Sequence, residues 1–490
     1  MSQPFCCKSF GALRLFLALL VATLLAACKV GPDYRRPAVE MPASYKEASH
    51  DWQQAAPRDG IDRGAWWSLY KDPVLDKLEA QVDVSNQNLK AAEAAYREAG
   101  IAVKETRATL FPSLTLNSSV GNMQGVPPIS MLPNSLYGAA AWAPDVWGRI
   151  RRGIDSDKAN AEASAADLAA ARLSMQATLA TDYFELRAQD ESKRLLDMTV
   201  EADTRAMQIA RRQYDTGTGD VADVLTAQTE LENIQSDAVN TSIRRAQLEH
   251  AIAVLVGKPP SDVSVAPRDF VDATPEIPAG VPSTLLERRP DIAAAERRMA
   301  AANAQIGVAT AAWYPDLTLS GSSGFASLTL SKLFQASNSF WTIGPALGET
   351  IFDAGARKDR IEQARAAYDR NAALYRQTVL TAFQQVEDNL AALRILAEQR
   401  TVQEISVSHA RATEQLMRQR YMNGAVPYSS VLTAQTARLN DEQSLLKLRQ
   451  SRLDASVALI QALGGGWDVS QLPAFVSGHL VQRQTKASLR

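Results

Sequence analysis

The chain has 490 residues, and its 52 lysines and arginines nearly balance its 54 aspartates and glutamates, which leaves a formal net charge of −2. This balance argues against a nucleic-acid partner, which a strongly basic chain would favour. The length alone allows two or three domains. Similar stretches recur far apart in the chain, however, so we predict one body made of two similar halves, mainly α-helical with a smaller β portion.

The N-terminus has the pattern of a secretory signal peptide over residues 1–27. Lys8 and Arg14 flank the start of an apolar run over residues 15–25, which is too short to span a membrane comfortably. The run ends in Leu-Ala-Ala-Cys, which resembles the bacterial lipoprotein box, in which cleavage precedes the cysteine and its thiol receives a diacylglycerol. Cleavage there would leave Cys28 as the only cysteine, so the mature chain has no disulfide. We predict a covalent lipid on Cys28; the alternative is an ordinary export signal with a chance cysteine.

Residues 28–63 are predicted to be a lipid-anchored extension. They carry many prolines, glycines and polar residues, a composition typical of irregular chain. Acyl chains contribute about 0.8 kcal/mol per buried methylene, so several chains on one cysteine anchor a protein firmly. Position 29 is lysine, not the aspartate that in lipoproteins of this kind signals retention at the inner membrane. The resemblance to lipoproteins therefore implies the outer membrane.

The first structural repeat is predicted over residues 64–257 and begins with helices. Apolar residues recur at helical spacing from Val74 to Leu110, with a break near Ser85. After Pro112 the period changes, and apolar residues alternate with polar or small ones. This alternation predicts a β-hairpin over residues 113–147.

Two long stretches, residues 154–216 and residues 356–423, contain neither glycine nor proline. As helices at about 1.5 Å per residue they would reach on the order of 95–100 Å. A shorter helical stretch follows each of them, and the connections near residues 214–223 and 421–430 are predicted to be the tips of two helical hairpins. Helices of this length are typical of coiled coils and helical barrels rather than of ordinary globular domains.

The two tips have nearly the same sequence. Tyr214 and Gly217 begin the first, and Tyr421 and Gly424 begin the second, 207 residues later (421 − 214 = 207). Each is followed at the same distance by the pentapeptide Val-Leu-Thr-Ala-Gln. A glycine between two helical runs is a natural place for a helix to end and for the chain to reverse. We therefore predict a tandem duplication with one tip in each half.

Residues 284–464 are predicted to repeat the plan of the first half. A helix over residues 285–312 precedes a second β-hairpin over residues 316–353. Six prolines within residues 258–283 predict an irregular linker between the halves. Residues 465–490 are predicted to form a peripheral C-terminal tail.

Four strands per chain have a consequence for assembly. In a bilayer every backbone polar group must be hydrogen-bonded, so a sheet can span only as a closed barrel. Four strands cannot close one, and about eight are the practical minimum. Either the four strands form a soluble sheet, or several chains share a barrel, with eight strands in a dimer and twelve in a trimer. The lipoprotein box favours a shared barrel, and the residue pattern leaves dimer and trimer open.

Two long motifs carry a family resemblance. Residues 286–298, Leu-Glu-Arg-Arg-Pro-Asp-Ile-Ala-Ala-Ala-Glu-Arg-Arg, and the run from Ala302 to Ala309 closely resemble a signature of the outer-membrane factors of tripartite efflux pumps. This is the TolC-like family, and the likeness is greatest to its NodT-type lipoprotein branch. Residues 145–149, Asp-Val-Trp-Gly-Arg, and residues 351–355, Ile-Phe-Asp-Ala-Gly, resemble that family's strand-to-helix junctions. The resemblance covers nearly the whole mature chain.

The resemblance implies a homotrimer in the outer membrane, whose twelve-stranded barrel continues into a periplasmic tunnel of twelve helices. Its partners would be a periplasmic adaptor protein and an inner-membrane exporter, commonly a proton-driven one of the RND type. The implied function is a passive exit duct for drugs or other small toxic compounds, without catalytic residues. A duct for type I protein secretion is an alternative. A lipid-anchored periplasmic coiled-coil scaffold without a pore is an alternative of a different class.

In this family the tips form a gate, and the resemblance implies candidate gate residues here. Asp220 and Asp223 lie one turn apart, and Asp223 matches a family tip aspartate; one such carboxylate per subunit would form an acidic ring that attracts cations. Asp220 has an alternative role as the N-cap of the return helix. The second tip departs from the family pattern, with Ser430 where an acidic residue is expected. Steric closure by Tyr421 and Tyr428 is the alternative to a second acidic ring.

No metal or cofactor site is expected apart from the lipid on the cysteine. The four histidines are scattered in the sequence, without an H-E-x-x-H pair or cysteine partners. The triple glycine at residues 464–466 follows a helical stretch and indicates a helix end rather than a phosphate-binding loop.

Overall fold

The structure covers the chain apart from its ends and a few internal stretches. The computed structural model describes residues 29–38, 42, 44–47, 65–121, 133–272, 274, 275, 277 and 285–473. The predicted signal peptide, Cys28, most of the extension over residues 28–63 and most of the predicted tail lie outside the described residues.

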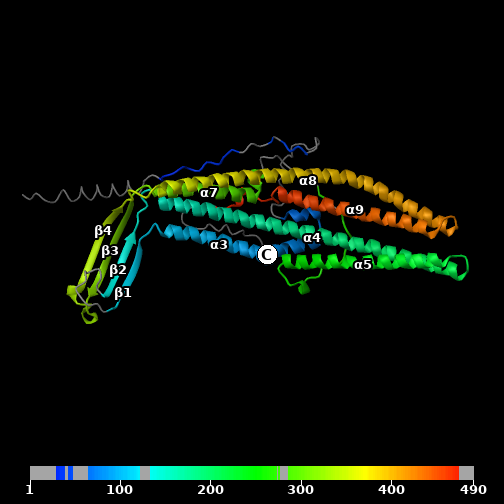
Figure 1. Ribbon diagram of the computed structural model, residues 1–490, viewed down its shortest axis with the longest axis horizontal. Helices are drawn as coiled ribbons and strands as arrows, with labels where there is room; N and C mark the ends of the chain where they lie inside the picture. Colours follow the sequence, from blue (N-terminus) through cyan, green and yellow to red (C-terminus); the bar gives the residue numbers. More distant parts are fainter. Residues whose placement is uncertain are drawn as a thin grey trace, which may run out of the picture.

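The molecule is elongated, with a sheet at one end and two helical hairpins that run to the other (Figure 1). Helix α4 (Arg149–Asp215) returns as α5 (Val221–Leu255), and α8 (Ala356–Met422) returns as α9 (Tyr428–Ala462). The other elements of the described chain are η1 (Trp66–Tyr70), α2 (Pro73–Ser85), α3 (Gln87–Ala108), β1 (Ser113–Ser119), β2 (Asn134–Trp142), η3 (Pro260–Asp262), α6 (Leu285–Arg288), α7 (Pro290–Ala311), β3 (Asp316–Ser327), η5 (Leu330–Lys332), η6 (Ala336–Asn338), β4 (Ser339–Gly348) and η7 (Val469–Gln471). Among the described helices, none has an apolar stretch long enough to cross a membrane.

The helical hairpins confirm the predicted duplication. Helices α4 and α8 have 67 residues each, α5 and α9 have 35 each, and the second hairpin begins 207 residues after the first (356 − 149 = 207). Helices α3 and α7 also share one length, 22 residues, but they are 203 residues apart (290 − 87 = 203). The four extra residues of the second half therefore lie between α7 and α8, in the segment that contains β3 and β4.

The first long helix begins earlier than predicted. The prediction placed its start at residue 154 because Gly153 comes before it, but α4 begins at Arg149. The two carboxylate oxygens of Asp145 each accept a hydrogen bond, at 2.9 Å, from a backbone N–H of the first turn. This external cap satisfies donors that a helix start otherwise leaves unpaired. The helix then tolerates Gly153 in its interior, at a cost of about 1 kcal/mol.

The single helix predicted over residues 285–312 is two helices. Helix α6 ends at Arg288 and α7 begins with Pro290. A proline disfavours the helical conformation in the residue before it, and Arg289 is extended, with φ −99° and ψ 120°. Its guanidinium donates to the carbonyl oxygen of Ala462 at 3.0 Å and pairs with Asp291 at 2.6 Å. The break thus directs a buried arginine onto the end of α9.

The four strands form one antiparallel sheet in the order β1-β2-β3-β4. The two predicted hairpins are present, and β2 pairs with β3, from Asn134 opposite Ser327 to Trp142 opposite Leu319. The two halves of the chain therefore join through their strands as well as through their helices. Strands β1 and β4 are the two edges of the sheet.

The two faces of the sheet differ in chemistry. The register places large apolar side chains, exposed in the single chain, on one face: Leu114, Leu116, Leu319, Trp341, Ile343 and Leu347. The opposite face carries mainly serine, threonine, alanine and glycine, with hydroxyl pairs 2.9 Å apart between Ser119 and Ser135 and 2.8 Å apart between Ser322 and Thr342. Alternation of this kind is typical of a sheet with lipid on one side and water on the other.

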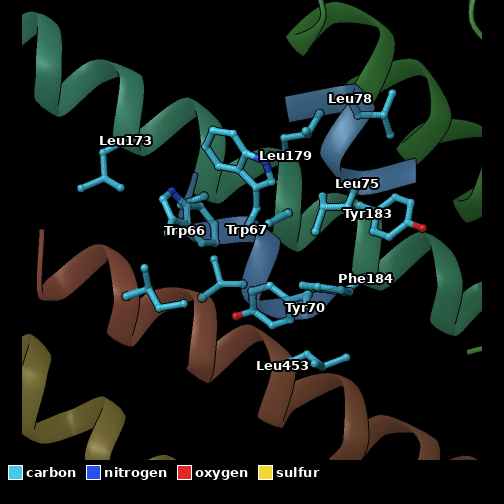
Figure 2. Close-up of a cluster of buried hydrophobic side chains, with 14 of the residues drawn as sticks. Trp66, Trp67, Tyr70, Leu75, Leu78, Leu173, Leu179, Tyr183, Phe184 and Leu453 are labelled. Carbon is cyan, nitrogen blue, oxygen red and sulfur yellow. The ribbon is translucent and has the colours of Figure 1, made fainter. Parts of the chain in front are cut away.

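The main hydrophobic core lies where the N-terminal elements meet α4 and α9 (Figure 2). Trp66 and Tyr70 of η1 are only 2% and 5% exposed, and the Tyr70 ring lies 4.9 Å from the ring of Phe184 on α4. The Tyr70 hydroxyl lies 2.7 Å from the hydroxyl of Ser456 on α9. Burial of a large apolar side chain contributes about 1.5–3 kcal/mol to the free energy of folding. The buried rings of η1 therefore stabilise the packing of the first hairpin against the second.

Residues 29–38 form an extended strap along the helices near the sheet. The Arg152 guanidinium of α4 donates to the carbonyl oxygens of Val30 and Gly31, at 3.0 Å each. Gly31 has φ 91°, and a Cβ at this position would lie 2.5 Å from the Cα of Gly307 on α7. The backbone of the strap therefore lies too close to α7 to leave room for a side chain at Gly31. This contact places Lys29 at the junction between the strands and α4.

Gly464 provides a test of the contact between the two ends of the second repeat. It follows α9 with φ 94°, and a Cβ there would lie 2.0 Å from the carbonyl oxygen of Arg288. Gly424 has a similar left-handed conformation, φ 70°, but nothing lies within 4 Å of such a Cβ. Left-handed strain costs a residue with a side chain about 1–2 kcal/mol. We expect Gly464→Ala to lower the midpoint temperature of thermal unfolding clearly more than Gly424→Ala, and equal shifts would contradict the close contact.

Candidate functional site at the helical tips

Both tips use the same backbone turn. Gly217 and Gly424 follow the long helices with φ 73° and φ 70°. The N–H of the residue after each glycine reaches back to the carbonyl oxygen five residues earlier, at Gln213 in the first tip and at Arg420 in the second, at 2.9 Å in both cases. This is the helix ending that a left-handed glycine makes possible. The nearly repeated sequence therefore gives two reversals with the same glycine conformation and the same closing hydrogen bond.

Asp220 caps the return helix of the first tip. Its carboxylate accepts a hydrogen bond from the N–H of Ala222 at 3.0 Å, so the capping role considered for this residue is confirmed. The matching position of the second tip (220 + 207 = 427) is Pro427, which makes no side-chain cap. The two tips thus share a backbone but begin their return helices by different means.

Tyr421 of the second tip contacts the first tip. Its hydroxyl donates to the side-chain oxygen of Gln213 at 2.9 Å, which joins the ends of α8 and α4. Burial raises the pKa of the Tyr421 hydroxyl, and the nearby carboxylate of Asp223 raises it further. The structure therefore brings Tyr421, Gln213 and Asp223 together. Tyr214 is exposed, and Ser430 lies in the first turn of α9 with its backbone N–H bonded to Pro427 at 3.1 Å.

Tyr428 lies between the hairpins instead of projecting from them. It is 2% exposed, and its ring centroid lies 5.3 Å from that of Tyr421. It packs in a small apolar cluster with Ala210, Val224 and Val431. Within the part of the chain that the structure describes, its hydroxyl has no hydrogen-bond partner, and burial raises the pKa of that hydroxyl. In the single chain Tyr428 is therefore a packing residue, while Tyr421 both packs and forms a hydrogen bond.

Below the tips, buried polar residues connect the two hairpins. The carboxylate of Asp203 on α4 is fully buried and accepts a hydrogen bond from the side chain of Gln435 on α9 at 2.6 Å. Burial raises the pKa of Asp203, although the hydrogen bond from Gln435 opposes the shift. Arg438 of α9 pairs with Glu414 of α8 and points a guanidinium nitrogen to the hydroxyl of Thr199 on α4, 3.5 Å away. Breaking such a buried network costs more than breaking surface pairs.

A polar groove of about 460 Å³ runs between α5 and α9 next to this network. Its lining residues are Glu230, Asn233, Ile234, Ser236, Asp237, Gln435, Thr436, Leu439, Asn440 and Gln443. Burial raises the pKa of Glu230, and the carboxylates of Asp203 and Asp237 raise it further. The groove carries acidic side chains and no basic ones, so it favours a basic or polar occupant.

Sequence reasoning missed Gln213, Asp203 and Gln435, which connect the hairpins. A signal was present for two of them: 207 residues on, Gln213 is replaced by Arg420 and Asp203 by Ala410. A contact between unlike hairpins need not be symmetric, so a difference in charge or polarity between matching positions is one signal of such a contact. In the described residues, no group of three His, Cys, Asp or Glu side chains is placed to hold a metal ion.

Comparison with known proteins places the chain in a family. The family model described as outer membrane efflux protein matches residues 80–258 and 281–465. The chain belongs to this family. The probable efflux pump outer membrane protein TtgC of Pseudomonas putida is 29% identical over 459 residues, which are 91% of this chain and 94% of that protein. The cation efflux system protein CusC of Escherichia coli is 29% identical over 457 residues, 92% of this chain and 98% of CusC.

Solved structures of the family have the same architecture. The outer-membrane channel OprN has a TM-score of 0.81 and 31% identity, over 90% of this chain and all of OprN. The open state of the MtrE outer membrane channel of Neisseria gonorrhoeae has a TM-score of 0.75 and 26% identity, over 90% of this chain and 99% of MtrE. As a member of the outer membrane efflux protein family, the chain is an efflux channel of the outer membrane. Its long helices form a large periplasmic part.

The hydroxyl of Tyr421 can be tested against that of Tyr428. Tyr421→Phe removes one hydrogen bond between the tips, worth about 0.5–1.5 kcal/mol, whereas Tyr428→Phe removes a hydroxyl without a partner. We expect amide hydrogen exchange in the first tip, around residues 213–219, to become faster in Tyr421→Phe than in Tyr428→Phe. Equal exchange in both variants would show that the Tyr421–Gln213 bond does not hold the tips together.

Proposed function

We propose that three copies of the chain form one passive exit duct for drugs or other small toxic compounds. The observation that carries an assembly of several copies is the four-stranded sheet, whose apolar face is open and whose edges β1 and β4 have no strand partner among the described residues; the number three is the one that the family resemblance implies. Leu114 is 81% exposed and Ile343 is 80% exposed, and both lie on the apolar face. Lipid contact with this face requires that the edges be paired, and three sheets give twelve strands (3 × 4 = 12).

The proposed duct has no energy source of its own and works with two partners. An inner-membrane exporter, of the proton-driven RND type, supplies the energy, and a periplasmic adaptor connects it to the helical tips. The polar groove between α5 and α9 is the proposed docking surface for that adaptor, because its acidic residues suit basic side chains. Its position beside Asp203 and Gln435 would let docking act on the contacts between the hairpins.

A lipid on Cys28 is proposed as the anchor of each chain. The residue after it, Lys29, pairs with Asp155 of α4 at 2.5 Å, and the N–H of Val30 lies 3.4 Å from the carbonyl oxygen of Trp147. These contacts support an anchor beside the strand-to-helix junction, where a membrane surface would lie. Acyl chains placed there would hold the sheet at its depth in the membrane.

The cargo is proposed as small compounds rather than secreted polypeptides, in keeping with the relatives. The names of those relatives describe pumps for toluene, for antibiotics and for cations, so they share a class of function and not one substrate. The test is deletion of the gene in its native host, followed by growth against a panel of antibiotics, dyes and organic acids, with the secreted proteins profiled in parallel. Hypersensitivity with unchanged secretion supports the proposal. A lost secreted protein with unchanged resistance would overturn it in favour of a secretion duct.

The acidic ring proposed at the tip can be tested through Asp223. In a trimer it would place three carboxylates around one axis, and such a ring raises the local concentration of cations. We expect Asp223→Asn to shift the reversal potential in a salt gradient toward lower cation selectivity in planar bilayers. Asp220→Asn is the matched control, because asparagine also caps helices and only a charge is lost. An unchanged reversal potential in Asp223→Asn, or an equal change in both variants, would rule out Asp223 as the selective ring.

A further inference from the structure

The inner face of the sheet carries one pair of aromatic side chains. In the proposed channel the apolar face meets lipid, so the serine- and threonine-rich face lines the water-filled interior. The register assigns Tyr137, Gly324 and Phe340 to this inner face, in one row across β2, β3 and β4. Among the described strand residues, the other side chains of this face are small or polar: Ser113, Thr115, Asn117, Ser119, Ser135, Ala139, Ala141, Asp316, Thr318, Ser320, Ser322, Ala326, Thr342 and Ala346.

Gly324 allows the two rings to approach each other. The centroids of Tyr137 and Phe340 lie 5.8 Å apart and their planes are inclined at 60°, although a strand separates the two residues. A Cβ on Gly324 would lie 2.4 Å from the Cα of Tyr137, so a side chain at this position has no room. Because Gly324 has no side chain, Tyr137 comes close to the backbone of β3, and its ring reaches the ring of Phe340 across this strand. Both rings remain partly exposed in the single chain.

The pair lies at the outer end of the sheet. Tyr137 follows the start of β2 by three residues and Phe340 follows the start of β4 by one, and both strands begin at the end of the sheet farther from the helices (Figure 1). A compound that leaves the helical part would meet the pair near the outer end of the strands, late on its path. Three chains would place three such pairs around the interior.

We infer that Tyr137 and Phe340 form a binding site for aromatic organic compounds inside the channel, and this inference rests on the proposed trimeric duct. Aromatic rings in water offer an apolar surface and a negatively polarised face, which attract flat apolar and organic cationic groups. An aromatic contact of this kind strengthens binding by about two- to tenfold. Weak binding is what a passive duct needs, because a compound held tightly would not leave.

The experiment compares two monovalent organic cations on the full-length protein in planar bilayers. Tetraphenylphosphonium carries aromatic rings and tetrabutylammonium carries alkyl chains of similar bulk, so both respond alike to charge. We expect tetraphenylphosphonium, added on the side of the strands, to reduce the current of the unmodified channel at a concentration at least threefold lower than tetrabutylammonium. In Tyr137→Leu/Phe340→Leu, which keeps the apolar bulk and removes the rings, this preference should disappear.

Trp341→Leu is the matched control, because it removes a ring from the same strand but on the lipid face. It should keep the preference. Equal block by the two cations in the unmodified channel, or an unchanged preference in the double variant, would overturn the inference while leaving the duct intact. A protein without conductance would overturn the duct itself. The binding site would then be tested by equilibrium dialysis of tetraphenylphosphonium against the solubilised protein. If the rings bind this cation, its affinity must be lower in the double variant than in the unmodified protein, and an equal affinity would overturn the inference.

Discussion

Backbone hydrogen bonding in hydrocarbon is the constraint on which the rest of this molecule depends. A sheet of four strands has two unpaired edges, and water can satisfy those edges but lipid cannot. The apolar face of the sheet suits lipid, so the trimer proposed above would meet this constraint by pairing β1 and β4 with strands of other copies. The long helices would then share the symmetry of the strands, because only residues 143–148 connect β2 to α4 and only residues 349–355 connect β4 to α8. The proposed assembly therefore follows from the sheet rather than from the helices.

The two tips show how a duplicated backbone can carry different chemistry. Both reversals depend on a left-handed glycine, and neither glycine meets a neighbouring atom that its missing side chain would displace. Once the turn is fixed in this way, the residues around it are free to diverge. Asp220 caps α5 with its side chain, whereas Pro427 precedes α9 without a side-chain cap. Tyr428 is buried between the two hairpins, whereas Val221, at the matching position of the first tip, is exposed. The bond between Tyr421 and Gln213 is one that this divergence made possible, because position 214, the counterpart of 421, and position 420, the counterpart of 213, do not form it in the same way.

Much of the fold could be predicted from the sequence, because long helices, strand alternation and glycine reversals are local features. The 207-residue repeat, the four strands and the N-cap role of Asp220 were of this kind. Helix starts were less accurate, since Asp145 caps α4 from outside the helix and moves its start ahead of Gly153. The bonds from Tyr421 to Gln213 and from Gln435 to Asp203 could not be predicted, because they join residues 208 and 232 positions apart and depend on how two helices pack.

The equal lengths of the two hairpins limit how this protein can evolve. Each residue added to a helix advances its end by about 1.5 Å, so a change in α4 alone would move one tip past the other and separate Tyr421 from Gln213. An insertion in one hairpin therefore breaks the contact between the tips unless an insertion of equal length occurs in the other hairpin. The strand region carries no such restriction, and it is there that the spacing of the halves changes from 203 to 207 residues. Variation in length between relatives should accumulate at the sheet, and the length of the hairpins should stay constant.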